Sequence, residues 1–531
     1  MTPVEVYDTT LRDGAQAEGV SFSVEDKRQI LLLLDELGVA YVEGGWPNPS
    51  NPKDVEFFEI ARDLPLARTK LAAFGSTRRV GLAPEDDPQL QALLDSGAPT
   101  ITIFGKSWDL HVKTVLRTTR EENLRMVEES VAFLREAGRE VLFDAEHFFD
   151  GFRDDPGYAL ATLQAAERGG ARRIVLCDTN GGGLPSRIAD ATRAARAAVK
   201  TPVGIHAHND AGCATANSIV AVEEGCTHVQ GTINGYGERC GNADLCVVVP
   251  NLELKLGRRC LPNKAALAQL RHVSRVVAEI AMLEPDPRQP YVGASAFAHK
   301  AGMHQDGITK SSRSFEHVPP ESVGNERRYL LSDQAGAAAV QKKLERLFPQ
   351  LEKNSPQVRE VLARVKEMEN AGYEFEAADA SFELLALEVM GLRQRLFDVR
   401  RLTVLVKETA RDAEEVFAEA ALQLGINGDE LSGVADGDGP VHALDNAVRQ
   451  AIGRRYPHIQ DLALTDFKVR VVSGKEGTAA KVRVLITSSD GEHTWTTVGA
   501  HENIIWASWK ALVDSYEYGL LHVGRPAAPS A

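Results

Sequence analysis

Cysteine is scarce in this chain, and a long apolar run is missing. The 531 residues include six cysteines, which show no Cys-x-x-Cys spacing and all lie in the first half of the sequence. This pattern predicts free thiols in a reducing compartment rather than a disulfide framework or a zinc cluster. The longest purely aliphatic run, residues 30–34, is far too short to cross a bilayer, and the first residues leave no room for a signal peptide. We therefore expect a cytoplasmic protein.

Positive charge is also in short supply. The chain has 60 lysines and arginines against 75 aspartates and glutamates, which gives a net charge of −15. Nucleic acids and anionic membranes both require a basic face, so neither is an expected partner. The remaining composition, with 43% hydrophobic and 25% charged residues, is typical of a soluble globular protein, and the length predicts two or three domains.

Short β-branched runs alternate with longer helical stretches from the start of the chain to about residue 240. Two of the helical stretches, 25–37 and 120–137, carry a clear apolar stripe. The strand candidates are 4–9, 41–45, 71–74, 100–104, 140–145, 173–177, 203–207 and 228–233. Eight evenly spaced strand and helix units predict a closed (β/α)8 TIM barrel, an α/β fold, with a doubly wound sheet as the alternative.

Polar side chains follow most of the predicted strands. In a (β/α)8 barrel, catalytic residues lie where the strands run into the following loops, at the C-terminal mouth. Such ends occur at residues 8–14, 144–147, 177–180, 206–210 and 234–242. One polar strand end would be explained by a solvated rim. Several ends that carry carboxylate, imidazole and amide groups toward one mouth indicate a functional site.

The seventh predicted strand carries two histidines on one face. Alternate residues of a strand share a face, so His206 and His208 could bind one divalent metal, although a lone pair of this kind is more often a wet strand edge. Asp13 and Asn242 would add a carboxylate and a carboxamide, a mixed ligand set that suits Mn²⁺, Mg²⁺, Co²⁺ or Zn²⁺. Four protein ligands leave two positions open for the carboxylate and keto oxygen of a 2-oxo acid, whose carbonyl the metal would polarise. Arg12 could supply positive charge to the oxyanion that forms, or it could form an ion pair with a neighbouring carboxylate.

Three of these segments resemble a known family. Residues 8–16 (DTTLRDGAQ), 206–210 (HAHND) and 237–242 (GERCGN) look like the signatures of the metal-dependent acyl-CoA condensing and lyase barrels. That family includes 2-isopropylmalate, homocitrate and citramalate synthases and hydroxymethylglutaryl-CoA lyase. Residues 296–307 (AFAHKAGMHQDG) resemble the segment that follows the barrel in the synthases but not in the lyase.

The second strand points to one branch of the family. Residues 41–47 (YVEGGWP) and 50–54 depart from the Glu-Ala-Gly-Phe-Pro form usual in 2-isopropylmalate synthases and look like the citramalate synthase branch. The resemblance implies pyruvate as the 2-oxo acid and acetyl-CoA as the second substrate. The alternatives are a 2-isopropylmalate synthase, a metal-dependent lyase or aldolase, and a non-catalytic amino-acid sensor.

The resemblance also implies roles for particular residues. Glu146 resembles the glutamate that helps to enolise or hold acetyl-CoA, and Thr179 resembles the threonine that binds the substrate carboxylate. His304 with Asp306 resembles the pair that completes the site, and Gln16 is expected beside the metal. Glu238 and Arg239 fit an internal salt bridge that positions the loop of Asn242.

Beyond the barrel the resemblance implies a regulated dimer. The expected parts are a TIM-barrel catalytic domain at 1–263, a mainly helical linker or lid at 264–395, a C-terminal α+β regulatory domain at 396–524 and a disordered tail at 525–531. In the family the linker reaches over the active site of the partner subunit, which implies a homodimer in which His304 and Asp306 could act in trans. Isoleucine, as the end product of a citramalate route, is the expected effector of the C-terminal domain. A dimerisation module without a ligand is the alternative.

Overall fold

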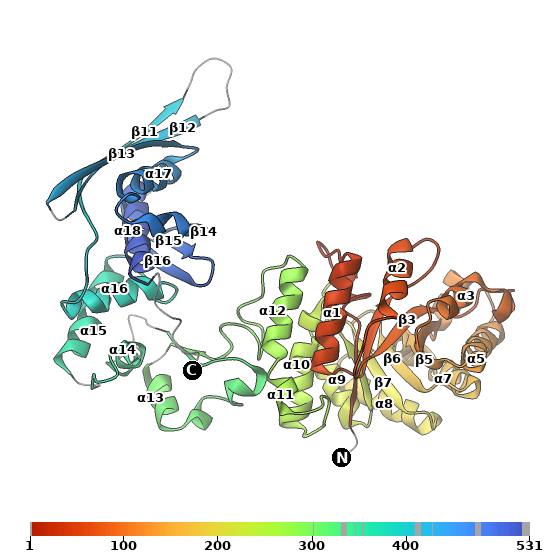
Figure 1. Ribbon diagram of the computed structural model, residues 1–531. Coiled ribbons are helices and arrows are strands. Elements are labelled where there is room, and N and C mark those ends of the chain that lie inside the picture. The colour runs from red at the N-terminus through yellow and green to blue at the C-terminus, as the bar shows by residue number, and fades with distance from the viewer. Residues whose placement is uncertain are drawn as a thin grey trace. The chain divides into compact units, whose positions relative to one another are not determined.

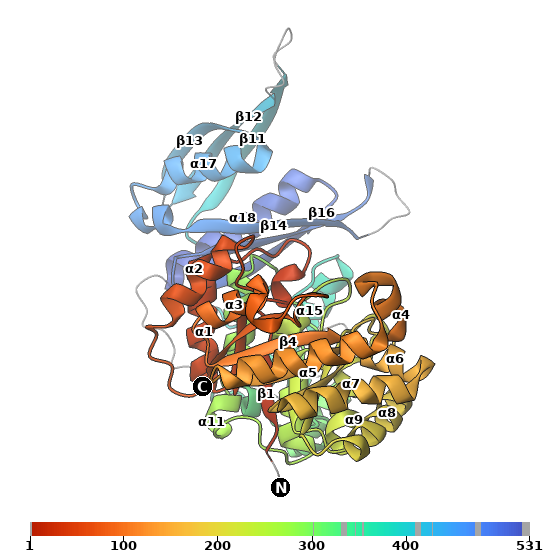
Figure 2. The same cartoon turned by 90° about the vertical axis from the view of Figure 1, so that its right-hand side faces the viewer.

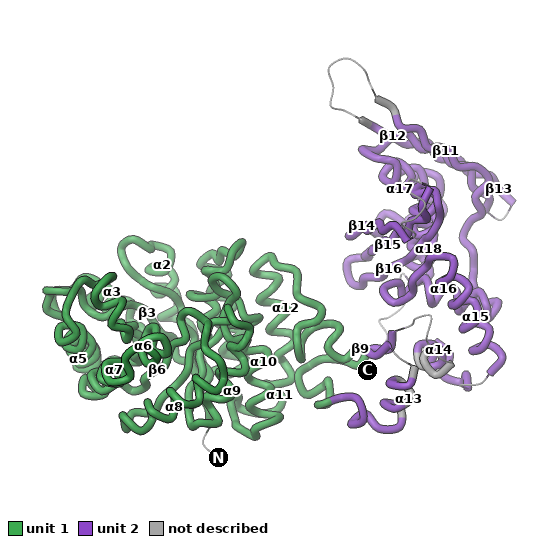
Figure 3. Tube along the Cα trace, turned by 180° about the vertical axis from the view of Figure 1, so that it is seen from behind, with its two compact units in different colours: residues 1–297, 317–327 green, residues 298–316, 328–531 purple. Residues whose placement is uncertain are grey.

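The computed structural model describes residues 3–300, 302–330, 337–345, 347–352, 355–408, 416–426, 428–472 and 479–522. The tail predicted at 525–531 lies outside these residues. The chain divides into two compact units, one made of Met1–Phe297 with His317–Arg327 and the other of Ala298–Glu316 with Arg328–Ala531 (Figure 3).

The first unit is a closed barrel of eight parallel strands that pair in chain order. The first and last strands close the barrel, with Tyr7 opposite Gln230 in register. The strands are β1 (Glu5–Asp8), β2 (Tyr41–Gly45), β3 (Lys70–Ser76), β4 (Thr100–Lys106), β5 (Glu140–Glu146), β6 (Arg173–Asp178), β7 (Val203–Ala207) and β8 (His228–Gly231). The predicted α/β barrel is confirmed, and the doubly wound sheet is ruled out.

Helices surround the strands of this unit (Figures 1 and 2). They include α1 (Val24–Leu37), α2 (Pro52–Ala61), α3 (Pro88–Asp95), α5 (Arg120–Glu136), α6 (Phe148–Asp154), α7 (Pro156–Gly169), α8 (Pro185–Ala198), α9 (Ala214–Glu223), α10 (Leu245–Pro250), α11 (Lys264–Leu267) and α12 (Leu270–Ile280). The predicted helices 25–37 and 120–137 agree with α1 and α5 to within one residue at each end. A capping box in which Ser23 and Asp26 bond each other's backbone N–H groups fixes the start of α1.

Alternation along the strands decides which side chains enter the barrel. In β5, Val141, Phe143 and Ala145 join the apolar layer beneath the helices, whereas Leu142 belongs to a separate interior cluster with Tyr7. Asp144 shares the inward face with Leu142 because successive side chains of a strand point to opposite sides. The same alternation turns polar groups of several strands toward the barrel axis.

The end of the eighth strand differs from the prediction. The predicted strand 228–233 stops at Gly231, and a 3-10 turn, Ile233–Gly235, follows. Thr232 forms a bridge with Asp244, and Asn234 adopts a left-handed conformation with φ of 62°. Pairing with β1 stops at Gly231 because β1 itself ends at Asp8, opposite Gly231, and the backbone of Thr232 bonds to Ala243 and Leu245 instead.

The second unit combines helices with two antiparallel sheets. Its helices include α13 (Gly302–Lys310), α14 (Ala337–Leu344), α15 (Pro356–Asn370) and α16 (Asp379–Val389), and β9 (Ala298–His299) pairs with β10 (Arg328–Tyr329). One sheet holds β11 (Asp398–Glu408), β12 (Val416–Ile426) and β13 (Asp429–Gly437), followed by α17 (Pro440–Ile452). The other holds β14 (Ala463–Val471), β15 (Val482–Ser489) and β16 (Thr494–His501), followed by α18 (Ile504–His522).

The sequence patterns located only part of these sheets. The alternation at 402–406, 467–471 and 482–486 lies in β11, β14 and β15, and the expected turn at Asp490-Gly491 joins β15 to β16. No strand was predicted for β12 or β13. Alanine is frequent in β12, and aspartate and glycine are frequent in β13; all three have low strand propensity. Pairing of β12 with β11 and of β13 with β12, rather than local preference, therefore defines these strands.

Two expectations on composition can be compared with the structure. All six cysteines are free thiols. Among the described residues, every helix is too short or too polar to span a membrane.

Candidate active site

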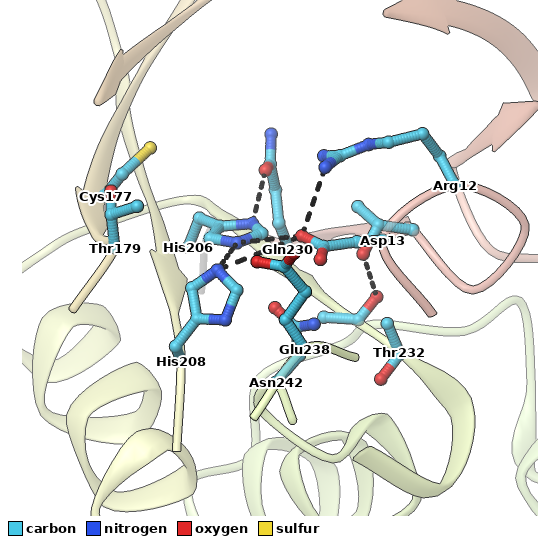
Figure 4. A network of polar contacts seen from close by, with 12 residues as sticks. Arg12, Asp13, Cys177, Thr179, His206, His208, Gln230, Thr232, Glu238 and Asn242 are labelled. Atoms are coloured by element: carbon cyan, nitrogen blue, oxygen red, sulfur yellow. Dashed lines mark hydrogen bonds and ion pairs between the residues drawn. The ribbon is translucent and has the colours of Figure 1, made fainter. Parts of the chain in front are cut away.

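Three side chains of types that can bind a metal ion meet at the C-terminal mouth of the barrel. Asp13 follows β1, and His206 and His208 lie at the end of β7. The Oδ2 atom of Asp13 is 3.3 Å from Nε2 of His206 and 4.0 Å from Nε2 of His208, and the two Nε2 atoms are 3.3 Å apart. All three side chains are buried, and their ligand atoms lie within 4.8 Å of one another (Figure 4). The structure thus brings together three of the four predicted ligands at bonding separation from a common point.

Asn242 reaches the same place through the loop after β8. Its backbone forms a bridge with His208, and its Nδ2 group donates to the carbonyl oxygen of Tyr236. Its Oδ1 atom is buried and accepts no hydrogen bond from any residue that the structure describes. A Cβ at Gly237 would overlap the Asn242 amide, so glycine is needed for this approach. A buried acceptor without a donor, beside two imidazoles and a carboxylate, fits a divalent cation.

The electrostatics of Asp13 and His208 suit metal binding. Burial by itself would raise the pKa of Asp13, but the Arg12 guanidinium and His206 outweigh it and hold that pKa well below its usual range. Burial and the neighbouring charge of His206 lower the pKa of His208 to about 4. Asp13 is therefore charged and His208 neutral near pH 7, which are the states in which each binds a metal.

Arg12 is fixed by two carboxylates and an aromatic ring. Its Nε donates to Oε1 of Glu43 at 2.6 Å, and its Nη1 lies 3.3 Å from Oδ2 of Asp13. The guanidinium lies 3.8 Å from the ring centre of Phe74, and the hydroxyl of Tyr7 donates to Oε2 of Glu43 at 2.6 Å. The ion pair that was one of two interpretations of Arg12 is present. No role for Glu43 was predicted from the sequence, although it is a carboxylate near the end of the second strand.

A second chain of hydrogen bonds supports His206 from inside the barrel. Nδ1 of His206 lies 2.9 Å from Oε1 of Gln230, and Nε2 of Gln230 donates to Oδ1 of Asp144 at 3.1 Å. Burial raises the pKa of Asp144 to about 7. Bonds of this kind fix the ring orientation of a metal-binding histidine. Gln230 was not predicted as a site residue, and the only signal for it in the sequence is a polar residue on the inward face of a buried strand.

A cavity of about 220 Å³ opens beside the metal-binding groups. It brings together seven of the predicted site residues, which are Arg12, Asp13, Gln16, Glu146, Thr179, His206 and His208. Glu146 forms an ion pair with Lys106, and the hydroxyl of Thr179 accepts a bond from the backbone N–H of His147 at 2.9 Å.

Arg239, in the loop after β8, links the loops after β6 and β7 at the mouth of the barrel. It donates to both oxygens of Asp210 at 2.8 and 2.9 Å and to the carbonyl oxygen of Thr179 at 2.8 Å. Glu238 is more distant, with Oε2 3.6 Å from Nη1 of Arg239. The expected internal salt bridge therefore exists, but Asp210 on the β7 loop is its main acidic partner.

The remaining predicted pair belongs to the second unit. His304 lies in α13, is exposed, and stacks on Phe315 with ring centres 4.3 Å apart. Asp306 lies in the same helix, and its side chain is outside the described part of the structure.

Three stretches of the chain match protein families. Residues 3–277 match the HMGL-like family, and residues 291–372 match the homocitrate synthase post-HMGL domain. Residues 376–520 match the LeuA allosteric (dimerisation) domain. The first match spans the barrel, and the other two follow it along the chain.

Relatives are similar over nearly the full length. An (R)-citramalate synthase from Synechocystis sp. is 50% identical over 530 residues, which cover 98% of this chain and 96% of the relative. Proteins of the same name from Geobacter sulfurreducens and Aquifex aeolicus are each 48% identical, over 520 and 519 residues, and in both pairs 98% of each chain is covered.

Proposed function

This chain belongs to the HMGL-like family, and from that premise we propose that it is a metal-dependent acyltransferase with citramalate synthase activity. It condenses acetyl-CoA with pyruvate and water to give (R)-citramalate and CoA. The observation that carries the proposal is the buried cluster of Asp13, His206 and His208, which lines a cavity together with Arg12 and Glu146. A small keto acid and an acyl donor could meet in that cavity.

We assign the divalent metal to Asp13, His206, His208 and Asn242. Mn²⁺ or Mg²⁺ suits this mixed nitrogen and oxygen set best, and Co²⁺ or Zn²⁺ would also be accepted. A cation bound there would act as a Lewis acid toward the keto group of the acceptor. The chain of Gln230 and Asp144 behind His206 keeps the imidazole turned toward the site.

Arg12 is the group we assign to the developing oxyanion. Glu43 and Asp13 hold its guanidinium at one wall of the cavity, so positive charge is already in position when the acceptor oxygen gains negative charge. Glu146 is assigned to enolising or holding acetyl-CoA, and its ion pair with Lys106 holds the side chain at the cavity.

Two further residues are assigned to binding the acceptor acid. The Thr179 hydroxyl already accepts the N–H of His147, which leaves its own proton to donate to a carboxylate. Gln16 lines the same cavity and offers a carboxamide. His304 and Asp306 would complete the site, and the family resemblance supports their acting across a homodimer.

The C-terminal part is proposed to regulate the enzyme. The division into a catalytic domain (1–263), a linker or lid (264–395) and a regulatory domain (396–524) remains our proposal, and the match to an allosteric dimerisation domain supports its last part. We propose isoleucine as the effector, a cytoplasmic location, and a place in a threonine-independent route to isoleucine.

A thiol-release assay tests the function. The metal-loaded enzyme is incubated with acetyl-CoA and a panel of 2-oxo acids, and the product is identified by chiral chromatography. We expect release of CoA that depends on pyruvate and forms (R)-citramalate. A preference for 2-oxoisovalerate would assign the chain to the 2-isopropylmalate synthases. Cleavage of a hydroxyacyl-CoA without condensation would make it a lyase, and inactivity with every acid would favour the amino-acid sensor.

A further inference from the structure

One wall of the cavity is apolar. Of the fourteen described residues that line the cavity, three carry large apolar rings, Trp46, Phe74 and Phe104, whereas most of the others are charged or polar. A 2-oxo acid turns its carboxylate and keto oxygen toward the polar wall, so its alkyl group is left against the rings. Resting on the function proposed above, we propose that Trp46 sets the size limit for that alkyl group, admitting the methyl of pyruvate and excluding branched chains.

The three rings form one packed cluster. Phe74 and Phe104 stack with ring centres 5.5 Å apart and planes inclined by 22°. The indole of Trp46 stands nearly perpendicular to both, with ring centres 5.7 Å from each and interplanar angles of 86° and 82°. Because the indole makes edge-to-face contacts with both rings, it cannot turn away from a larger substrate without losing both contacts.

The backbone of Trp46 is held as firmly as its ring. Its N–H donates to Oδ2 of Asp54 at 2.8 Å, and the other oxygen of Asp54 accepts a bond from Lys27. Lys27 also donates to the carbonyl oxygen of Gly44 at 2.8 Å, and the Lys27 and Asp54 side chains are both buried. Gly45 has a φ of 149°, and a Cβ there would overlap the Asp54 carboxylate. The backbone of residues 44–46 is therefore held by the buried pair of Lys27 and Asp54.

Trp46 is also the ring best suited to substitution. Phe74 lies under the Arg12 guanidinium, and the ring centre of Phe104 is 5.2 Å from Nζ of Lys106, which pairs with Glu146. Changing either phenylalanine would disturb a charged group of the site. Changing Trp46 should alter the space beside the apolar wall with less effect on those charged groups.

The test compares Trp46→Ala and Trp46→Phe with wild type on pyruvate, 2-oxobutanoate and 2-oxoisovalerate. A hydrophobic pocket discriminates by roughly 10–200-fold per methylene, so Trp46→Ala should raise kcat/KM for 2-oxoisovalerate relative to pyruvate by at least about 10-fold. Trp46→Phe should fall between the two and improve 2-oxobutanoate most. Phe133→Leu is the control, because Phe133 packs against the hydrophobic core from α5 and does not line the cavity. In this control, the ratio of kcat/KM for 2-oxoisovalerate to kcat/KM for pyruvate should equal that of wild type.

A second measurement tests the role of Trp46 independently of the synthase activity. Calorimetric titration of the Mn²⁺-loaded proteins with pyruvate and 2-oxoisovalerate, without acetyl-CoA, should show the same change in relative affinity. An unchanged ratio in a folded Trp46→Ala protein would overturn the role of Trp46 while leaving the synthase activity of wild type intact. Wild type that binds and selects between the acids but never releases CoA would overturn the function alone. Absence of binding to either acid would overturn both.

Discussion

The Asp144→Asn substitution should change how stability depends on pH. Burial raises the pKa of Asp144 from 3.8 to about 7 in the folded chain. A carboxyl group that holds its proton more tightly when folded stabilises the protein below its unfolded pKa, and that stability is lost as pH rises through the folded pKa. Asparagine carries no charge at either pH, and its carbonyl oxygen can still accept the bond from Gln230.

The size of the effect follows from the pKa difference. About three pKa units separate the folded and unfolded groups, and each unit corresponds to about 1.4 kcal/mol, so the full difference is about 4 kcal/mol. About two of those three units lie between pH 5 and the folded pKa of about 7. Between about pH 5 and about pH 8 the wild type should therefore lose about 3 kcal/mol more than the Asp144→Asn variant.

Denaturant unfolding of the metal-free full chain, followed by circular dichroism at several pH values, provides the measurement. Asp86→Asn is the control, because it makes the same chemical change at an exposed position. A difference between wild type and Asp144→Asn that stays constant from pH 5 to pH 8 would refute the reasoning. A variant that is less stable than wild type at pH 8 would do the same.

Three other predictions concern the metal, the effector and the β2 segment. Replacing His206 or His208 by Ala should abolish turnover and metal retention measured by elemental analysis, and activity with metal still bound would remove that residue from the ligand set. Isoleucine should inhibit CoA release, and deletion of residues 396–531 should relieve the inhibition; persistent inhibition of an active truncated enzyme would place the effector elsewhere. Lys27→Met should cost about 3–5 kcal/mol of unfolding free energy because it leaves Asp54 buried and unpaired, whereas Arg28→Met, in an exposed pair with Glu25 on the same helix, should cost almost nothing. Equal effects of the two substitutions would contradict the buried pair.

The barrel was predictable because its strands are locally distinctive. β-branched runs, polar strand ends and amphipathic helices each follow from short-range patterns, and eight repeats leave few other folds. The residues His206, His208 and Asp13 could be proposed for the same reason, since two histidines on one strand face and a carboxylate after the first strand are visible in the sequence. The strands β12 and β13 are rich in residues of low strand propensity, and they form where β12 pairs with β11 and β13 pairs with β12.

The contacts behind those ligands could not be predicted, because they depend on how the barrel closes. Glu43 reaches Arg12 across neighbouring strand ends, and Gln230 reaches both His206 and Asp144 across the interior. Which inward residues meet is set by the stagger and tilt of the eight strands, and no local pattern in the sequence records these quantities. Arg239 shows the same limit, since Glu238 adjoins it in sequence but Asp210 is its closer acidic partner.

The polar residues inside the barrel are compatible with a stable core. A TIM barrel usually fills this space with branched apolar side chains, whereas here Tyr7, Glu43, Asp144 and Gln230 occupy it. Burying such groups is costly unless each is bonded, and the two hydrogen-bonded chains satisfy that condition, one leading to Arg12 and the other to His206. The charge on Asp144 is the exception, because an amide would accept the same bond at lower cost near neutral pH. A charged carboxylate at that position is favourable only if nearby positive charge offsets the cost of its burial. A divalent cation held by His206 would supply such charge.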